Sequence, residues 1–182
     1  MAELLVCWQE ADRADDIAAA LHRIQSDVDI LLVSEIADIK RQIQFSSRLL
    51  RDLFDLFPIY TVRAQYLFDY LAIIIPCLRR TLQDIWHRLG DYPDFSFNRI
   101  WVDLDEHFRT QGDVSLKERI TLYNDFLVQL VRLLSRSAAS FPVIGGSLTV
   151  SRPWMYDAST LELLRIRVLR LRIGRGLPGT HS

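Results

Sequence analysis

The sequence predicts an all-α protein, a mostly antiparallel bundle of five to six helices with one long spine helix and a long loop before the last helix. The first 57 residues contain neither glycine nor proline, which argues against the frequent turns of a β protein. Apolar residues in this region recur at steps of three and four, the period of a helix. Two Ser-x-x-Glu patterns, typical of helix starts, precede later apolar runs.

The first two helices are expected over 2–25 and 27–57. Ser26 fits the N-cap of the second helix and predicts a break there, although the spacing also allows one continuous helix. Pro58 is expected to end the second helix. Its apolar series has coiled-coil-like steps sustained over more than four heptads. The series consists of Val28, Leu32, Ile36, Ile39, Ile43, Ser46, Leu50, Leu53 and Phe57.

Later apolar runs predict a third helix over 61–89, with a kink or break at Pro76, and a short helix over 98–111. A helix over 116–136 follows the capping box that begins at Ser115. The second capping box, Ser159 to Glu162, predicts a last helix over 160–173.

One domain is expected over 1–173. Within it, 137–156 holds two prolines, a glycine pair and five hydroxyl residues, a composition that predicts a loop. We expect this loop to be disordered or inserted. Residues 174–182 are expected to form a flexible tail.

Part of the chain resembles helical proteins predicted from filamentous fungi. The resemblance covers about residues 60–173 and implies a helical fold, but it transfers no functional residue. Relative to those proteins, about 138–155 looks like an insertion, which is either a disordered surface loop or translated intron sequence. The resemblance is carried by residues 66–71, 76–82, 116–118, 126–136 and 161–165.

Composition excludes several classes of protein. Cys7 and Cys77 are the only cysteines, so neither a disulfide framework nor a cysteine zinc site is expected. The most apolar stretch, 70–78, is much shorter than the ~20 residues of a membrane span, and the N-terminus lacks the features of a signal peptide. We therefore expect a cytoplasmic or nuclear protein with no transmembrane segment.

No pattern predicts a catalytic, cofactor or metal site, and we expect a protein that is not an enzyme. Asp103 and His107 are four residues apart on one expected helix face, but a metal needs three or four ligands. A solvated acidic face is the favoured interpretation. The tryptophans, apart from Trp154, are expected to fill the core.

The first functional prediction is a helical protein-interaction or scaffold module. Apolar residues recur along the spine helix over a greater length than a small bundle must bury. This helix is therefore expected to offer an apolar face to a protein partner or to a second copy. The candidate interaction residues are Leu32, Ile36, Ile39, Ile43 and Leu50.

The alternative prediction is a binder of anionic surfaces, such as membrane headgroups or nucleic acid. Residues 1–131 hold 14 basic and 21 acidic side chains, whereas 132–182 hold 8 basic and 2 acidic ones. The favoured interpretation of this asymmetry is that the basic side chains pair with the acidic ones upstream. In the last helix Leu161, Leu164, Val168 and Leu171 form a stripe, although other apolar residues fall outside it. Parts of this segment also alternate like a strand, and the capping box favours the helix. The candidate anion contacts are Arg165, Arg167, Arg170 and Arg172.

Overall fold

The computed structural model describes the chain except for residue 1 and residues 26–27, 91–96, 112–113, 136–152 and 174–182. Within these described ranges every regular element is a helix, which confirms the predicted all-α bundle. The elements are α1 (Ala2–Ile24), α2 (Ile30–Ile59), α3 (Thr61–Ala64), the 3-10 turn η1 (Gln65–Leu67), α4 (Phe68–Gly90), α5 (Phe97–Thr110), α6 (Leu116–Ser135) and α7 (Pro153–Ile173).

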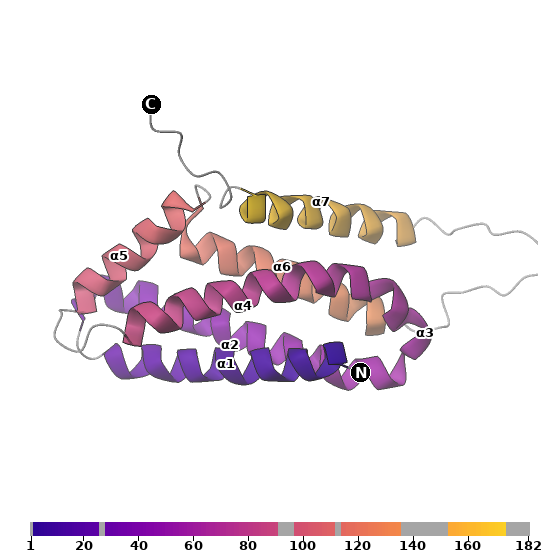
Figure 1. The fold of residues 1–182 in the computed structure, drawn as a ribbon, viewed down its shortest axis with the longest axis horizontal. Coiled ribbons are helices and arrows are strands. Elements are labelled where there is room, and N and C mark those ends of the chain that lie inside the picture. The colour runs from indigo at the N-terminus through magenta and orange to yellow at the C-terminus, as the bar shows by residue number, and fades with distance from the viewer. Residues whose placement is uncertain (1, 26–27, 91–96, 112–113, 136–152, 174–182) are drawn as a thin grey trace, which may run out of the picture.

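The long helices lie side by side, and α5 crosses one end of the bundle at an angle (Figure 1). α2 packs against both α1 and α6, and α1 also packs against α4. α7 covers α4 and α6, so that α7 and α1 lie on opposite sides of the bundle (Figure 1). The colour gradient shows that α1, α4 and α7 run in one direction, whereas α2 and α6 run in the other.

The core lies between these helices, and α1 contributes small side chains to it. Cys7, Ala11, Ala14 and Ala18 recur at steps of four, three and four and are buried. Small side chains allow neighbouring helices to approach closely. α2, α4 and α6 supply the larger buried residues, chiefly leucine and isoleucine.

A buried ion pair joins α1 to α4. The Glu10 side chain is 1% exposed, and its two carboxylate oxygens accept hydrogen bonds from Arg79 Nε (2.6 Å) and Arg13 Nη1 (2.8 Å). Arg79 comes from α4, whereas Arg13 lies on the next turn of α1. Two charged partners compensate for the removal of this carboxylate from water.

The first two helices are separate. α1 ends at Ile24, and α2 begins at Ile30 with Asp29 as its N-cap, so Ser26 is not the cap and the helix start at 27 is wrong. Ser26 itself lies outside the described residues. The carbonyl of Asp29 accepts hydrogen bonds from the amides of Leu32 and Val33, which begin the helical ladder.

Neither Pro58 nor Pro76 interrupts its helix. α2 includes Pro58 and ends one residue later. α4 runs through Pro76 without a break, and the break in the 61–89 region falls at η1 instead. Pro76 and Ala72 are both exposed. Water can therefore reach the Ala72 carbonyl, whose hydrogen bond the proline removes.

α7 begins earlier than predicted. It starts at Pro153, where a proline suits the first turn because its missing amide hydrogen would have no helical partner. Ser159 therefore lies inside the helix, and the predicted capping box at its start is wrong. Residues 153–156 of the predicted loop are helical. The remainder of that loop, and the predicted tail over 174–182, lie outside the described residues.

Candidate functional site

The predicted interaction residues of the spine helix are not available to a partner. Ile36, Ile39, Ile43 and Leu50 are fully buried, and Leu32 is half-buried against the same core. α1 and α6 of the same chain cover this side of α2. The expectation of a free face is therefore wrong, because intramolecular packing uses the entire apolar stripe.

The predicted arginines lie on α7, away from the acidic side chains that were expected to pair with them. Arg165 is half-buried and donates to Glu162 across 3.3 Å within the same helix. Arg167 and Arg170 are exposed and pair with no other described residue. Arg172 belongs to the helix, but its side chain lies outside the described part of the chain. The expected pairing is wrong for the three described arginines.

The opposite face of α7 is buried as predicted. Leu161, Leu164, Val168 and Leu171 all pack into the core. The outward face also carries apolar residues, because Leu163 is 64% exposed and Ile166 is 41% exposed. α7 therefore has one apolar face against the bundle and a mixed apolar and basic face outside it.

A second exposed apolar surface lies at the seam between α1 and α2, and we call it the Trp8 surface. Trp8 remains 40% exposed although its ring contacts Phe54 at a centroid distance of 5.4 Å. Leu5 lies one turn before Trp8 and is 60% exposed. Pro58, one turn after Phe54, and Ile59 are also exposed. The Trp8 surface consists of Leu5, Trp8, Phe54 and Pro58, whereas Ile59, five residues after Phe54, lies on another face of α2.

Arg51 fixes the position of the Trp8 ring. Its guanidinium lies 5.2 Å from the ring centroid and donates to Asp12 (2.9 Å) and Asp15 (2.7 Å) of α1. A third hydrogen bond reaches Ser47 Oγ at 2.6 Å. The hydrogen bond to Asp15 is the main cause that raises the Arg51 pKa above its ordinary value. A tryptophan held in place loses little side-chain entropy when a partner binds it.

The seam around the Trp8 surface is acidic. Asp12 and Asp15 share one arginine, and the side chains of both keep about half of their surface in contact with solvent (54% and 45%). Two further exposed aspartates lie one turn from this group, Asp16 after Asp12 on α1 and Asp55 after Arg51 on α2, and the exposed Arg48 lies one turn before Arg51. A surface of this kind attracts positively charged partners.

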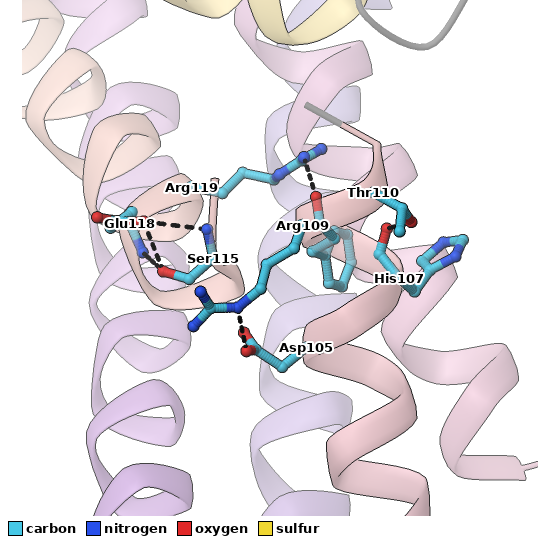
Figure 2. A network of polar contacts seen from close by, with 8 residues as sticks. Asp105, His107, Arg109, Thr110, Ser115, Glu118 and Arg119 are labelled. Carbon is cyan, nitrogen blue, oxygen red and sulfur yellow. Dashed lines mark hydrogen bonds and ion pairs between the residues drawn. The ribbon is translucent and has the colours of Figure 1, made fainter. Parts of the chain in front are cut away.

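A different polar cluster lies where α5 meets α6 (Figure 2). The Ser115 amide donates to Glu118 Oε2 at 3.0 Å, and the Glu118 amide donates to Ser115 Oγ at 3.3 Å. This reciprocal pair confirms the predicted capping box. The Ser115 hydroxyl also donates to Glu118 Oε2 (2.8 Å), and this hydrogen bond, followed by the one from the Ser115 amide, lowers the Glu118 pKa.

Arg119 is fully buried beside this capping box. Its Nη2 donates to the Phe108 carbonyl at 3.1 Å, and the guanidinium lies 5.0 Å from the centroid of the Phe108 ring (Figure 2). Its Nε and Nη1 have no hydrogen-bond partner in the described part of the chain. Burial lowers the Arg119 pKa.

His107 links α5 to α4. Arg88 Nη2 lies 2.8 Å from His107 Nδ1, and Gln111 Nε2 lies 2.7 Å from His107 Nε2. Because an arginine can only donate, Nδ1 accepts and the ring is neutral with its proton on Nε2, which can then donate only to the oxygen end of the Gln111 side-chain amide. Burial, followed by the charge of Arg88, lowers the His107 pKa, and the opposing charge of Asp84 is a smaller effect.

The side chains that the sequence offered for a metal site do not come together in the described residues. Asp103 is exposed, whereas His107 is engaged by Arg88 and Gln111, so the two do not form a shared site. Three or more metal-binding side chains do not gather anywhere in the described ranges. Burial raises the Cys7 pKa to about 11, which keeps this thiol protonated and poorly nucleophilic near neutral pH.

Two of these features were missed by the sequence analysis. Trp8 and Trp86 were expected in the core, yet both are exposed, and only Trp101 among the described tryptophans is buried. Arg119 lies three residues after Leu116 and four before Tyr123, which places it on the buried face of α6. That spacing was the available signal for a buried cation, because Leu116 and Tyr123 are large apolar residues on one face of the predicted 116–136 helix.

Comparisons with protein families, with curated proteins and with solved structures found no match to this chain. In the parts that the structure describes, no helix combines the length and the apolar character required to span a bilayer.

Proposed function

We propose that this chain is a non-enzymatic helical protein-interaction module whose binding site is the Trp8 surface. The observation that supports the proposal is a half-exposed tryptophan, held by Phe54 and Arg51, within an exposed apolar seam. Tryptophan and arginine are the residue types that most often dominate binding energy at protein interfaces.

The charge of the seam favours a basic partner. Four exposed or half-exposed aspartates lie along the seam, namely Asp12, Asp15, Asp16 and Asp55, and Arg51 is already paired with two of them. An amphipathic helix with leucine on one side and arginine on its flanks would place apolar groups on Trp8 and positive charges beside the aspartates.

Binding of synthetic peptides tests this proposal. A labelled amphipathic peptide of leucine and arginine should bind the wild-type chain, as measured by fluorescence anisotropy, and its affinity should fall as salt rises. The matched peptide of leucine and glutamate should not bind. Equal binding of the two peptides would contradict the role of the acidic seam.

Single substitutions localise the binding site. Trp8→Ala and Leu5→Asn should each weaken binding of the leucine and arginine peptide, Trp8→Ala by about tenfold or more. Val102→Ala is the matched control, because Val102 is an exposed apolar residue on α5, outside the Trp8 surface. Circular dichroism should show unchanged helix content for all three. Unchanged affinity of both surface variants would disprove the site.

A second candidate function is contact with an anionic surface through α7. Arg167 and Arg170 support it, because both are exposed and pair with no other residue in the described ranges. Binding to vesicles of acidic phospholipid, or to duplex DNA, should fall steeply with salt and should be lost in the double variant Arg167→Glu, Arg170→Glu. Binding that survives this double change would exclude α7 as the contact.

A further inference from the structure

The outward face of α7 has the same spacing as the outward face of α1, with opposite charge. On α1, Leu5 and Trp8 are followed four residues later by Asp12. On α7, Leu163 and Ile166 are followed four residues later by Arg170. All of these side chains are exposed. Each helix thus presents two apolar groups and one charge at positions i, i+3 and i+7, which share one helix face.

The geometry points to a second copy of this chain as the occupant of the Trp8 surface, with the α7 of that copy packed parallel to α1. In the parallel arrangement Leu163 faces Leu5 and Ile166 faces Trp8. The same alignment places Arg170 beside Asp12. An antiparallel arrangement would instead set Arg170 against Leu5, which would bury the arginine charge without an opposite charge beside it. This inference rests on the proposed function, because it names the partner of the same surface.

The fold permits this contact without a large rotation between copies. Within one copy, α1 and α7 lie on opposite sides of the bundle and run in the same direction (Figure 1). A second copy stacked in the same orientation therefore presents its α7 parallel to the α1 of the first. The contact joins two different surfaces, so each copy keeps one free surface of each kind.

Charge complementarity supports the choice of occupant. The α1 segment holds five acidic and two basic side chains, whereas the α7 segment holds four basic and two acidic ones. The acidic seam and the basic face are too far apart to meet within one copy, since the bundle lies between them (Figure 1). Contact between copies brings them together.

The mass of the chain in solution tests the inference. Multi-angle light scattering on the wild-type chain should give an average mass above the monomer value of 21.2 kDa, and this mass should rise with protein concentration. High salt should lower it, because exposed charges are screened. A constant monomer mass at all concentrations would overturn the inference.

Two blocking variants identify the surfaces. Leu5→Arg damages only the Trp8 surface, and Leu163→Asp damages only the α7 face. Each variant alone should remain monomeric. An equimolar mixture should form a one-to-one dimer and nothing larger, because one intact surface of each kind remains. A mixture that stays monomeric, or single variants that still associate, would contradict contact between these two surfaces.

A charge exchange tests the alignment. Asp12→Arg and Arg170→Asp should each weaken self-association about tenfold, and the double variant should recover most of the loss. Val102→Asp is the control, because it places the same charge on an exposed apolar site of α5, and its association should match that of the wild type. No recovery in the double variant would overturn the parallel alignment.

The peptide assay separates this inference from the proposed function. If the leucine and arginine peptide binds at the Trp8 surface while the wild-type chain remains a monomer, the proposed function holds and the second copy is not the partner. If neither the peptide nor a second copy binds, both proposals fail.

Discussion

The hydroxyl of Ser46 on α2 donates a hydrogen bond to Oδ1 of Asn124 on α6 across 2.6 Å, and both side chains are buried. The side-chain Nδ2 of Asn124 in turn donates to the backbone carbonyl of Gln42 (3.0 Å) and to the side-chain Oε1 of Gln42 (2.7 Å). This network lies within the apolar interface of the two helices. It fixes their register, because a shift along the axis would leave buried polar groups without partners.

Asn124→Ala should lower the free energy of unfolding by about 2 kcal/mol, because it removes the donor to the buried Gln42 Oε1 and leaves the Ser46 hydroxyl with only the more distant Gln42 carbonyl (3.1 Å) as acceptor. Urea denaturation followed by circular dichroism measures the change. Gln83→Ala, at an exposed position on α4, should change stability by less than about 0.5 kcal/mol. An equal effect of the two substitutions would show that the network does not stabilise the α2 and α6 interface.

Arg79→Ala should destabilise the bundle by about 1 to 2 kcal/mol. The change leaves the buried Glu10 carboxylate with Arg13 as its only charged partner among the described residues. Arg79 is itself partly exposed, which keeps the effect below that of a fully buried pair. Addition of Glu10→Gln to Arg79→Ala should recover part of the loss, since it removes the buried charge that has lost one of its two partners. A double variant less stable than Arg79→Ala would contradict this account.

The neutral state of His107 predicts a pH dependence of stability. Its folded pKa lies below the ordinary value of 6.5, so the contribution of His107 is fully present above pH 6.5. It is lost as the pH falls from 6.5 through the folded pKa, because protonation places a positive charge beside Arg88. His107→Gln should therefore have a flatter stability profile than the wild type below pH 6.5. Thermal melts across this range measure the difference, and parallel profiles would exclude His107 as the cause.

Ser115→Ala should cost about 1 kcal/mol, because it removes the hydroxyl that caps the first turn of α6. Ser115→Asp should keep most of the stability, since aspartate also accepts from the third amide of a helix. Urea denaturation of the three proteins at neutral pH gives the comparison. An aspartate variant as unstable as the alanine variant would show that the cap hydrogen bond is not the cause.

The sequence predicted the helices whose ends carry local signals. α6 begins after the capping box at Ser115, and α5 lies within one residue of its predicted limits. Of the kink or break expected at Pro76, the break does not occur, and the exposure of this turn lets water replace the hydrogen bond that the proline removes. Its exposure depends on tertiary packing, which spacing does not encode. The early start of α7 was missed because the second capping box offered a stronger local signal than Pro153.

The candidate site could not be predicted in the same way. Periodicity identified the apolar stripe of α2 but did not show that α1 and α6 would cover both of its edges. Trp8 was assigned to the core on residue type, whereas its exposure follows from its position at the outer seam of α1 and α2. The unpaired arginines of α7 depended on which side of the bundle this last helix would occupy. These are properties of the assembled helices rather than of any one segment.

The burial of Arg119 also affects how the bundle fluctuates. The Phe108 ring and carbonyl of α5 provide its described contacts on that side, and two of its nitrogens have no described partner. When α5 separates from α6, water hydrates the guanidinium, and this hydration lowers the free energy of the opened state. Local opening of the bundle should therefore begin at α5. The backbone amide hydrogens of α5 should exchange with deuterium before those of α2.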